Sequence, residues 1–404
     1  MYTEKLTITD FRCFAQQKMT FNWPNQTPPK GEEALRQPNV NLLIGNNGTG
    51  KTTIFQALAI AAMGPYLASN SSGFRTPTAI RYGKDVAEAV GGLLLAPIDT
   101  EENPAPDTAH LHLSAHRATS LIKREGTTQS LSTRTRATHW KESLFYEDRP
   151  ASFLAAYGAN RRIERPEAYN KRLRGPRYQQ IATLFESHIG LMPLSAAYSL
   201  CKERMRWDEV VHIVNALLQP PVQLTTHSTD GEPLFDYDGI LLPVAEISDG
   251  YRLFVGWLID CLTHLAQVLP KHQKLTEAIG MIIVDEVDLF LSPVWQRTVM
   301  ESLATAFPRI QWFCSTHSPL VAGTLESKNL FMVERCGPYT SAVRPCDEKV
   351  FGLSIDTILV RLFGLESPRA PELEMQLAEL EKKARQGDRA ASLEYMQRLR
   401  LGVK

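Results

Sequence analysis

A glycine-rich stretch carries the clearest chemistry in this sequence: Gly45-Asn46-Asn47-Gly48-Thr49-Gly50-Lys51-Thr52-Thr53. The apolar run Val40 to Ile44 precedes it and favours a buried strand, and a second apolar run from Ile54 favours a helix. Glycines let consecutive backbone N–H groups point inward, and a helix N-terminus adds partial positive charge. The stretch therefore predicts a P-loop for ATP, in which Lys51 reaches the terminal phosphates and Thr52 holds Mg²⁺. The alternative is a strand-to-helix turn that fits the pattern by accident.

A pair of acids and a histidine follow two later apolar runs. The run Ile279 to Val284 ends at Asp285 and Glu286, and the run Ile310 to Thr316 ends at His317. We expect Asp285 to bind Mg²⁺ beside Thr52, Glu286 to polarise the attacking water, and His317 to sense the γ-phosphate. Acidic strand ends and lone histidines also occur without function, so their order along the chain matters.

Composition sets limits on the class of protein. The 404 residues are 43% hydrophobic, and Lys plus Arg and Asp plus Glu each total 44, so no overall charge attracts nucleic acid or membrane. No apolar run approaches the roughly 20 residues of a spanning helix, and the N-terminus does not look like a signal peptide. We therefore expect a cytoplasmic protein that binds no membrane. Its six scattered cysteines are expected to be reduced structural thiols.

The secondary-structure elements expected along the chain, which must position these groups, divide it into four predicted regions. Residues 1–160 are expected to form an N-terminal lobe with a hairpin, the P-loop and, from 110 to 140, an exposed antiparallel ribbon. A basic and helical insert should span 161–240, including a hairpin that turns near Gly231. The carboxylate strand and His317 fall in a C-terminal lobe at 241–345, and a helical region should follow at 346–404.

Two basic features have open interpretations. Arg12 follows the first predicted strand, and it is either a solvated turn residue or a phosphate ligand. The segment Arg161 to Arg177 holds seven basic and two acidic residues. It is either a patch that binds phosphates, including those of nucleic acid, or a solvated loop.

The order of these motifs resembles the ABC-type ATPase head of the SMC and RecF class. Ile247-Ser248-Asp249-Gly250-Tyr251-Arg252 is similar to the Leu-Ser-x-Gly signature of that class, and His317 to its switch histidine. The resemblance implies an α/β P-loop fold with a mixed sheet, an antiparallel β subdomain, a helical insert and a C-terminal helical hairpin. It also implies a homodimer in which Ser248 and Gly250 close on the partner's ATP, and an N-terminal arginine, here Arg12, on phosphate. No clear Q-loop glutamine is found, and the strand Phe153 to Gly158 with Ala159, Asn160 and Arg161 is the candidate for that place.

Closer similarity is to the overcoming-lysogenisation-defect-like ATPases, especially the PtuA-type chains of Septu antiphage systems. It rests on Tyr157 to Arg161, Glu246 to Arg252, and Thr316 to Pro319, and on Asp285 to Asp288 with Pro293 to Arg297. Relatives often carry histidines where this chain has Phe290 and Ser292, so a role for those two positions is in doubt.

The resemblance implies a slow regulatory ATPase that forms a homodimer or larger assembly around ATP and controls a separate HNH-type nuclease. The chain itself offers no nuclease motif after His317. The alternative is a RecF-like ATPase of DNA repair or recombination, which would bind DNA across its dimer face. The third alternative, a transporter motor, fits poorly with Asp249 and with the long insert before the signature.

Overall fold

The computed structural model describes residues 1–28, 30–69, 72–95, 114–125, 128–135, 153–166, 169, 176–229, 231–367 and 369–400. It contains two compact units, Met1–Phe351 and Gly352–Lys404. The strands are β1 (Tyr2–Phe11), β2 (Phe14–Thr20), β3 (Val40–Ile44), β4 (Val86–Leu95), β5 (Ser114–Glu125), β6 (Thr128–Thr135), β7 (Phe153–Tyr157), β8 (Val222–Thr229), β9 (Glu232–Tyr237), β10 (Ile240–Pro243), β11 (Gly280–Val284), β12 (Ile310–Thr316), β13 (Leu330–Gly337) and β14 (Thr340–Pro345).

The helices lie between these strands and after them. They are α1 (Lys51–Leu67), α2 (Pro176–Gln179), α3 (Ala182–Phe185), α4 (Leu194–Glu203), α5 (Trp207–Leu217), α6 (Asp249–Val268), α7 (Pro293–Gln296), α8 (Val299–Ala306), α9 (Pro319–Ala322), α10 (Ile355–Arg361), α11 (Pro371–Arg385) and α12 (Arg389–Arg400), with short 3-10 helices η5 (Val244–Glu246), η6 (Leu275–Glu277) and η7 (Ser327–Asn329). Within the described residues, none of these helices combines the length and apolarity needed to cross a membrane.

A mixed six-stranded sheet in the order β14-β13-β3-β12-β11-β7 carries the site. Strands β13, β3, β12, β11 and β7 run parallel, and β14 pairs antiparallel with β13. Residues of β3, β7, β11 and β12 are buried throughout, as their apolar sequences predict. Because parallel strands end at the same edge, the segments after β3, β11 and β12 meet there.

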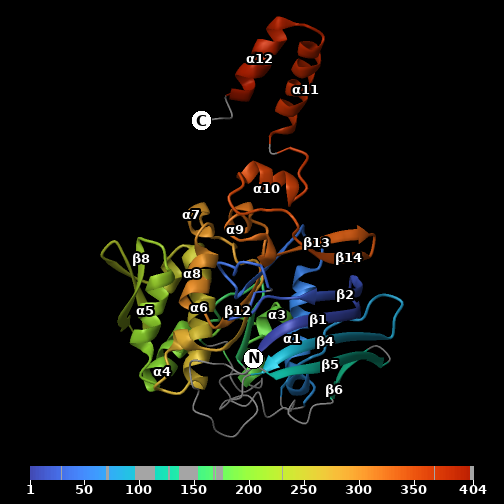
Figure 1. The fold of residues 1–404 in the computed structure, drawn as a ribbon. Coiled ribbons are helices and arrows are strands. Elements are labelled where there is room, and N and C mark those ends of the chain that lie inside the picture. Colours follow the sequence, from blue (N-terminus) through green and yellow to red (C-terminus); the bar gives the residue numbers. More distant parts are fainter. Residues whose placement is uncertain are drawn as a thin grey trace. The chain divides into compact units, whose positions relative to one another are not determined.

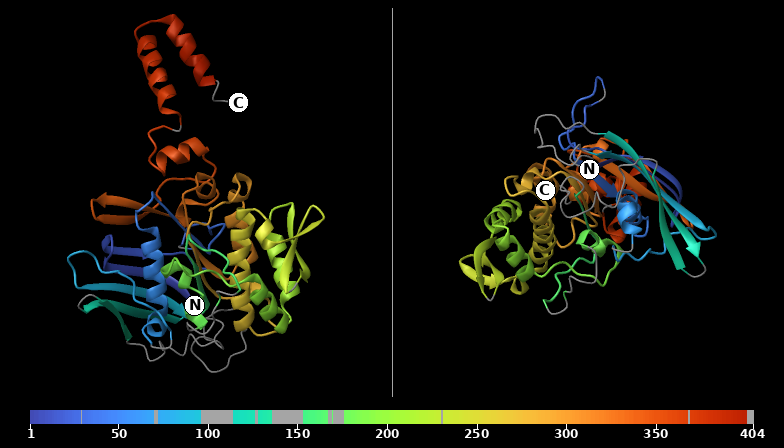
Figure 2. Two further views of the ribbon diagram at one scale, coloured as in Figure 1. Left: turned by 180° about the vertical axis from the view of Figure 1, so that it is seen from behind. Right: turned by 90° about the horizontal axis from the view of Figure 1, so that it is seen from below.

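An antiparallel sheet in the order β2-β1-β4-β5-β6 forms the predicted β subdomain. Strands β5 and β6 pair from Ala118 with Thr135 to Glu125 with Thr128, which confirms the antiparallel ribbon for its described part. The rest of that prediction, 110–113, 126–127 and 136–140, lies outside the described residues. Helix α1 packs against this sheet and is buried along almost its whole length (Figure 2). This burial fixes the N-terminus of α1 at the edge of the mixed sheet.

The helical insert lies beside α6. Helices α4 and α5 pack against α6, and α5 also contacts α8 (Figure 1). The predicted hairpin is present as β8 and β9, but β10 adds a third strand after a turn at Asp238 and Gly239. All six cysteines are free thiols, as expected.

The second unit has its own helical arrangement. Helices α11 and α12 form the predicted hairpin, in which Leu377 and Ala391 are buried. Ion pairs such as Glu379 with Lys383 and Glu394 with Arg398 lie along the exposed faces at helical spacing. The sequence therefore predicts the C-terminal hairpin correctly, and the described fold is the expected α/β P-loop head.

Candidate nucleotide site

The loop between β3 and α1 has the conformation that its glycines allow. Gly50 has a φ of 108° directly before the first residue of α1. A side-chain carbon at Gly45 would lie 2.2 Å from the carbonyl oxygen of Val333 on β13. Any larger residue at Gly45 would therefore separate β13 from the loop, and a β-carbon at Gly50 would be strained.

Lys51 is held inside this loop. It is 7% exposed, and its Nζ donates to the carbonyl oxygens of Gly45, at 2.7 Å, and Asn46, at 3.1 Å. Burial lowers the pKa of Lys51, while the negative charges of Asp285, Glu286 and Asp288 oppose that shift. The ammonium group is thus aimed into the loop, where it could donate to phosphate oxygens.

Thr52 and Asp285 lie side by side, although 233 positions separate them in the sequence. Thr52 Oγ1 donates to Asp285 Oδ2 at 2.5 Å, and Ser315 Oγ donates to Asp285 Oδ1 at 2.5 Å. A hydroxyl and a carboxylate are oxygen ligands of the kind that Mg²⁺ prefers, with water and phosphate completing the shell. The residues therefore fit a Mg²⁺–nucleotide complex, in which the metal would replace the Thr52–Asp285 hydrogen bond.

Glu286 follows Asp285 in an unusual backbone conformation. Its φ is 50°, in the left-handed region, and its N–H donates to Ser315 Oγ at 2.8 Å. A non-glycine residue held in this region costs of the order of 1 kcal/mol or more, so its surroundings must fix it. We name residues Asp285–Phe290 the carboxylate turn, because they are continuous turn structure after β11.

The buried side chain of Arg161 binds the backbone of the carboxylate turn. It is 2% exposed, and its guanidinium donates to the carbonyl oxygens of Gly158, Asp285 and Glu286 at 3.1, 2.5 and 2.8 Å. Burial lowers the pKa of Arg161 to about 10, and the nearby acids Asp285 and Glu286 oppose the shift. The sequence analysis missed this contact, because nothing in the spacing distinguishes Arg161 from the other basic residues of its segment.

Fewer basic side chains than expected are therefore available at the surface of the segment Arg161 to Arg177. Arg161 and Arg177 are each 2% exposed, so neither can present its charge to nucleic acid. Arg162 and Arg165 are exposed, while Lys171, Arg172 and Arg174 lie outside the described residues. The sequence interpretation was wrong for Arg161 and Arg177, because charge counted along a segment does not reveal which side chains turn inward.

A cavity of about 330 Å³ joins these groups. Its lining residues are Arg12, Cys13, Asn47, Gly48, Gly50, Lys51, Thr52, Thr53, Asp285, Glu286 and His317. Asn46 and Thr49 belong to the same loop but shape its backbone, since Thr49 Oγ1 donates to the Asn46 carbonyl at 2.9 Å. The predicted residues of the P-loop and of the carboxylate strand thus share one cavity.

Arg12 and His317 also line the cavity. Arg12 has a φ of 46°, and its Nε donates to the Thr78 carbonyl at 2.9 Å, so its backbone and side chain are both constrained. Burial lowers the pKa of Arg12 and of His317, and for His317 the positive charge of Lys51 adds to the effect. The lowered pKa favours a neutral His317 near pH 7, able to accept or donate one hydrogen bond.

The signature residues do not face this cavity. Ser248 is the N-cap of α6 and is exposed, and neither Ser248 nor Gly250 lines the cavity with Lys51. A β-carbon at Gly250 would lie 2.5 Å from the carbonyl oxygen of Phe290, so only glycine fits against the carboxylate turn. The described chain thus brings together the P-loop and the carboxylates but leaves the signature outside.

Comparison with known proteins agrees with this geometry. Residues 5–131 match the family "AAA domain", and residues 202–323 match "AAA domain, putative AbiEii toxin, Type IV TA system". Septu protein PtuA of Bacillus mycoides is 22% identical over 82% of this chain and 40% of its own length. Septu protein PtuA of Bacillus thuringiensis is 21% identical over 85% of this chain and 83% of its own length. The chain is homologous to the Septu protein PtuA.

A third relative is similar over a shorter part. Retron Vc95 probable ATPase of Vibrio cholerae is 28% identical over 32% of this chain. The chain spans a quarter of that protein and 40% of the Bacillus mycoides PtuA. The resemblance to PtuA-type chains is confirmed by these relatives. The two AAA-domain matches extend over both halves of the site, since one includes the P-loop and the other includes the carboxylate strand.

Proposed function

We propose that the chain is a cytoplasmic regulatory ATPase of bacterial antiphage defence, which forms a homodimer around ATP and controls a separate HNH-type nuclease. One observation carries the ATPase part of the proposal: Thr52, Asp285, Glu286 and Lys51 face one cavity, with Thr52 hydrogen-bonded to Asp285. The homology to PtuA and to a retron ATPase supports the defence role.

Each residue has a distinct part in the proposed reaction. Lys51 and the backbone N–H groups from Asn47 to Thr53 bind the phosphates, and Thr52 and Asp285 hold Mg²⁺. When bound, Mg²⁺ neutralises charge that develops on the phosphate oxygens. Glu286 orients and deprotonates the attacking water, and His317 donates a hydrogen bond to the γ-phosphate. Arg12 supplies a further positive charge in the lining of the cavity.

Ser248 and Gly250 are proposed to act on the partner's nucleotide. Both lie at the exposed N-terminus of a 20-residue helix, where backbone N–H groups and a serine hydroxyl favour a phosphate. They do not line the cavity of their own chain, which is consistent with a site completed by a second copy. ATP would then stabilise the dimer by its differential affinity for the paired state.

The test is a native mass measurement on the tagged chain, expressed with its neighbouring genes and purified in ATP and Mg²⁺. An assembly that contains a separate nuclease, and that changes when ATP is removed, supports the proposal. A bare ATP-dependent homodimer would favour the RecF-like alternative, in which DNA binding depends on salt through exposed residues such as Arg162 and Arg165. No ATP-dependent change in mass would contradict both.

A further inference from the structure

Strand β7 is in direct register with the strand that carries the carboxylates. Tyr157, its last residue, pairs with Val284, and the N–H of Asp285 donates to the Tyr157 carbonyl at 2.8 Å. Four residues further on, Arg161 donates to the carbonyls of Asp285 and Glu286. The segment Tyr157–Arg161 therefore holds three backbone groups of the two residues proposed to bind Mg²⁺ and to activate water.

The side chain of Tyr157 points away from the carboxylate turn, toward α6. Its hydroxyl donates to Asp260 Oδ2 at 3.0 Å, and its ring lies 5.6 Å from that of Trp257, one turn earlier on the same helix. Tyr157 is 1% exposed and Asp260 is 5% exposed. A hydrogen bond to a carboxylate in such a dry environment is stronger than one at the surface, and breaking it leaves the carboxylate short of a donor.

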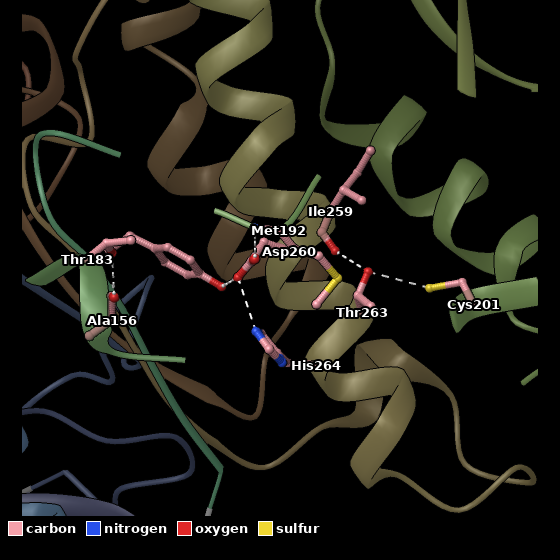
Figure 3. Close-up of polar contacts among 9 residues, drawn as sticks. Ala156, Thr183, Met192, Cys201, Ile259, Asp260, Thr263 and His264 are labelled. Carbon is pink, nitrogen blue, oxygen red and sulfur yellow. Dashed lines mark hydrogen bonds and ion pairs between the residues drawn. The ribbon is translucent and has the colours of Figure 1, made fainter. Parts of the chain in front are cut away.

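Asp260 is itself fixed by two other groups. Its Oδ1 accepts from the backbone N–H of Met192 at 2.9 Å, and His264 Nε2 lies 3.4 Å from its Oδ2 (Figure 3). The carboxylate therefore cannot rotate to follow Tyr157 without losing these partners. Displacement of Tyr157 must displace α6.

Helix α6 also contacts the carboxylate turn directly, near its own N-terminus. Gly250 lies against the carbonyl of Phe290, the last residue of that turn. Gly250 and Asp260 are ten positions apart, which is about 15 Å along a helix. A helix held at two points this far apart has little freedom to tilt independently of the groups that hold it.

We infer that Tyr157 is a positioning residue that couples the carboxylate turn to the signature end of α6. The functional consequence of this coupling rests on the proposed function. If the chain binds Mg²⁺ and nucleotide as proposed, a shift of Asp285 on binding would move Ser248 and Gly250 toward or away from the partner's phosphate. The coupling itself is a property of the chain without ligand.

The test compares Tyr157→Phe with Thr263→Val. Phenylalanine keeps the ring against Trp257 and the backbone bond to Asp285, and removes only the hydroxyl. Thr263 is the matched control, because it is buried on the same helix but donates to Ile259 of α6 and accepts from Cys201, away from Asp260 (Figure 3). Amide hydrogen exchange without nucleotide is measured in peptides covering residues 248–252 and 285–290.

We expect Tyr157→Phe to accelerate exchange in both peptides about 5-fold or more, while Thr263→Val accelerates neither. Asp260→Asn also changes the contacts to Met192 and His264, so it should accelerate exchange in both peptides at least as much. Adding Tyr157→Phe to Asp260→Asn should accelerate exchange no further, because the bond between the two side chains is already lost. Unchanged exchange at 248–252 in Tyr157→Phe would overturn the inference, even if its melting temperature fell.

A kinetic measurement separates this inference from the proposed function. If the wild type hydrolyses ATP, Tyr157→Phe should keep the wild-type affinity for ATP and lose about tenfold in kcat, which a purely structural role would not produce. If the wild type neither binds nor hydrolyses ATP, the proposed function fails, while the exchange experiment still decides the coupling.

Discussion

The nucleotide cavity and the signature end of α6 differ in how completely one chain builds them. In the cavity, Lys51 and Asp285 are 7% and 3% exposed, and their polar atoms are hydrogen-bonded within the chain. At the signature, Ser248 is exposed and Asp249 pairs only with Arg252 in the same turn of helix. The contrast indicates that the chain organises the cavity by itself and leaves the signature exposed, as the proposed dimer requires.

The largest expected effect separates chemistry from binding inside the cavity. In Glu286→Gln the hydrolysis rate should fall on the order of 10³-fold, because removing a general base typically costs 10²- to 10⁴-fold. The affinity for ATP should remain, and the ATP-bound dimer should accumulate. Phosphate release and nucleotide binding measure the two quantities. Glu277→Gln, at an exposed position, is the control, and hydrolysis by Glu286→Gln at the normal rate would contradict the assignment.

Lys51→Ala tests whether the buried ammonium group serves the nucleotide. Charge-assisted hydrogen bonds contribute about 1.5–3 kcal/mol each, so the loss of two bonds to phosphate should weaken ATP binding by at least about 100-fold. Equilibrium binding of a fluorescent ATP analogue provides the measurement. Lys349→Ala, at an exposed lysine, should bind as the wild type does. Retained affinity in Lys51→Ala would show that Lys51 only stabilises the loop through Gly45 and Asn46.

The open signature is tested by mixing two inactive variants. Ser248→Arg blocks the signature at an exposed position, so folding should be unaffected. Mixed with Lys51→Ala, it should recover about a quarter of wild-type hydrolysis, because half the dimers are mixed and each has one intact site of two. The recovery is measured against each variant alone. An absence of recovery would mean that Ser248 does not act across a dimer interface.

The contrast between the two regions also explains what could be predicted from the sequence. Asn46 to Thr53, Asp285 and His317 were found because each follows a buried apolar strand, and parallel strands bring their ends together. Ser248 and Gly250 were found only through a resemblance, since serine and glycine are common at helix starts.

The contacts behind the site could not be predicted from periodicity. Arg161 was expected on a surface patch but lies under the carboxylate turn, 124 positions from Asp285 in sequence. The bond between Tyr157 and Asp260 joins residues 103 positions apart, and no sequence periodicity links the two positions. Such pairs depend on the packing of β7 against β11 and α6, which the three-dimensional structure alone specifies. The third strand β10 was missed because the sequence analysis assigned a single turn, near Gly231, and not the second turn at Asp238 and Gly239.

The smallest expected effect concerns His317 and pH. Burial, aided by Lys51, lowers the pKa of His317 below its ordinary value of 6.5. As the pH falls below 6.5, the unfolded chain therefore takes up this proton before the folded chain does, and the free energy of unfolding decreases until the folded pKa is passed. Above 6.5 both states are neutral and the group contributes no pH dependence. Because His317 is only partly buried, solvent screening keeps the effect small.

His317→Gln should remove this slope and leave the remaining pH dependence in place. Urea unfolding of the wild type and the variant, between pH 7.5 and pH 5, measures the difference between their stabilities, which should shift in favour of the variant only on the acid side of about 6.5. His272→Gln, at an exposed histidine, provides the control. Parallel curves for the wild type and His317→Gln would mean that His317 is as well solvated as a surface residue. The surroundings of His317 would then resemble the exposed signature region more than the buried part of the cavity.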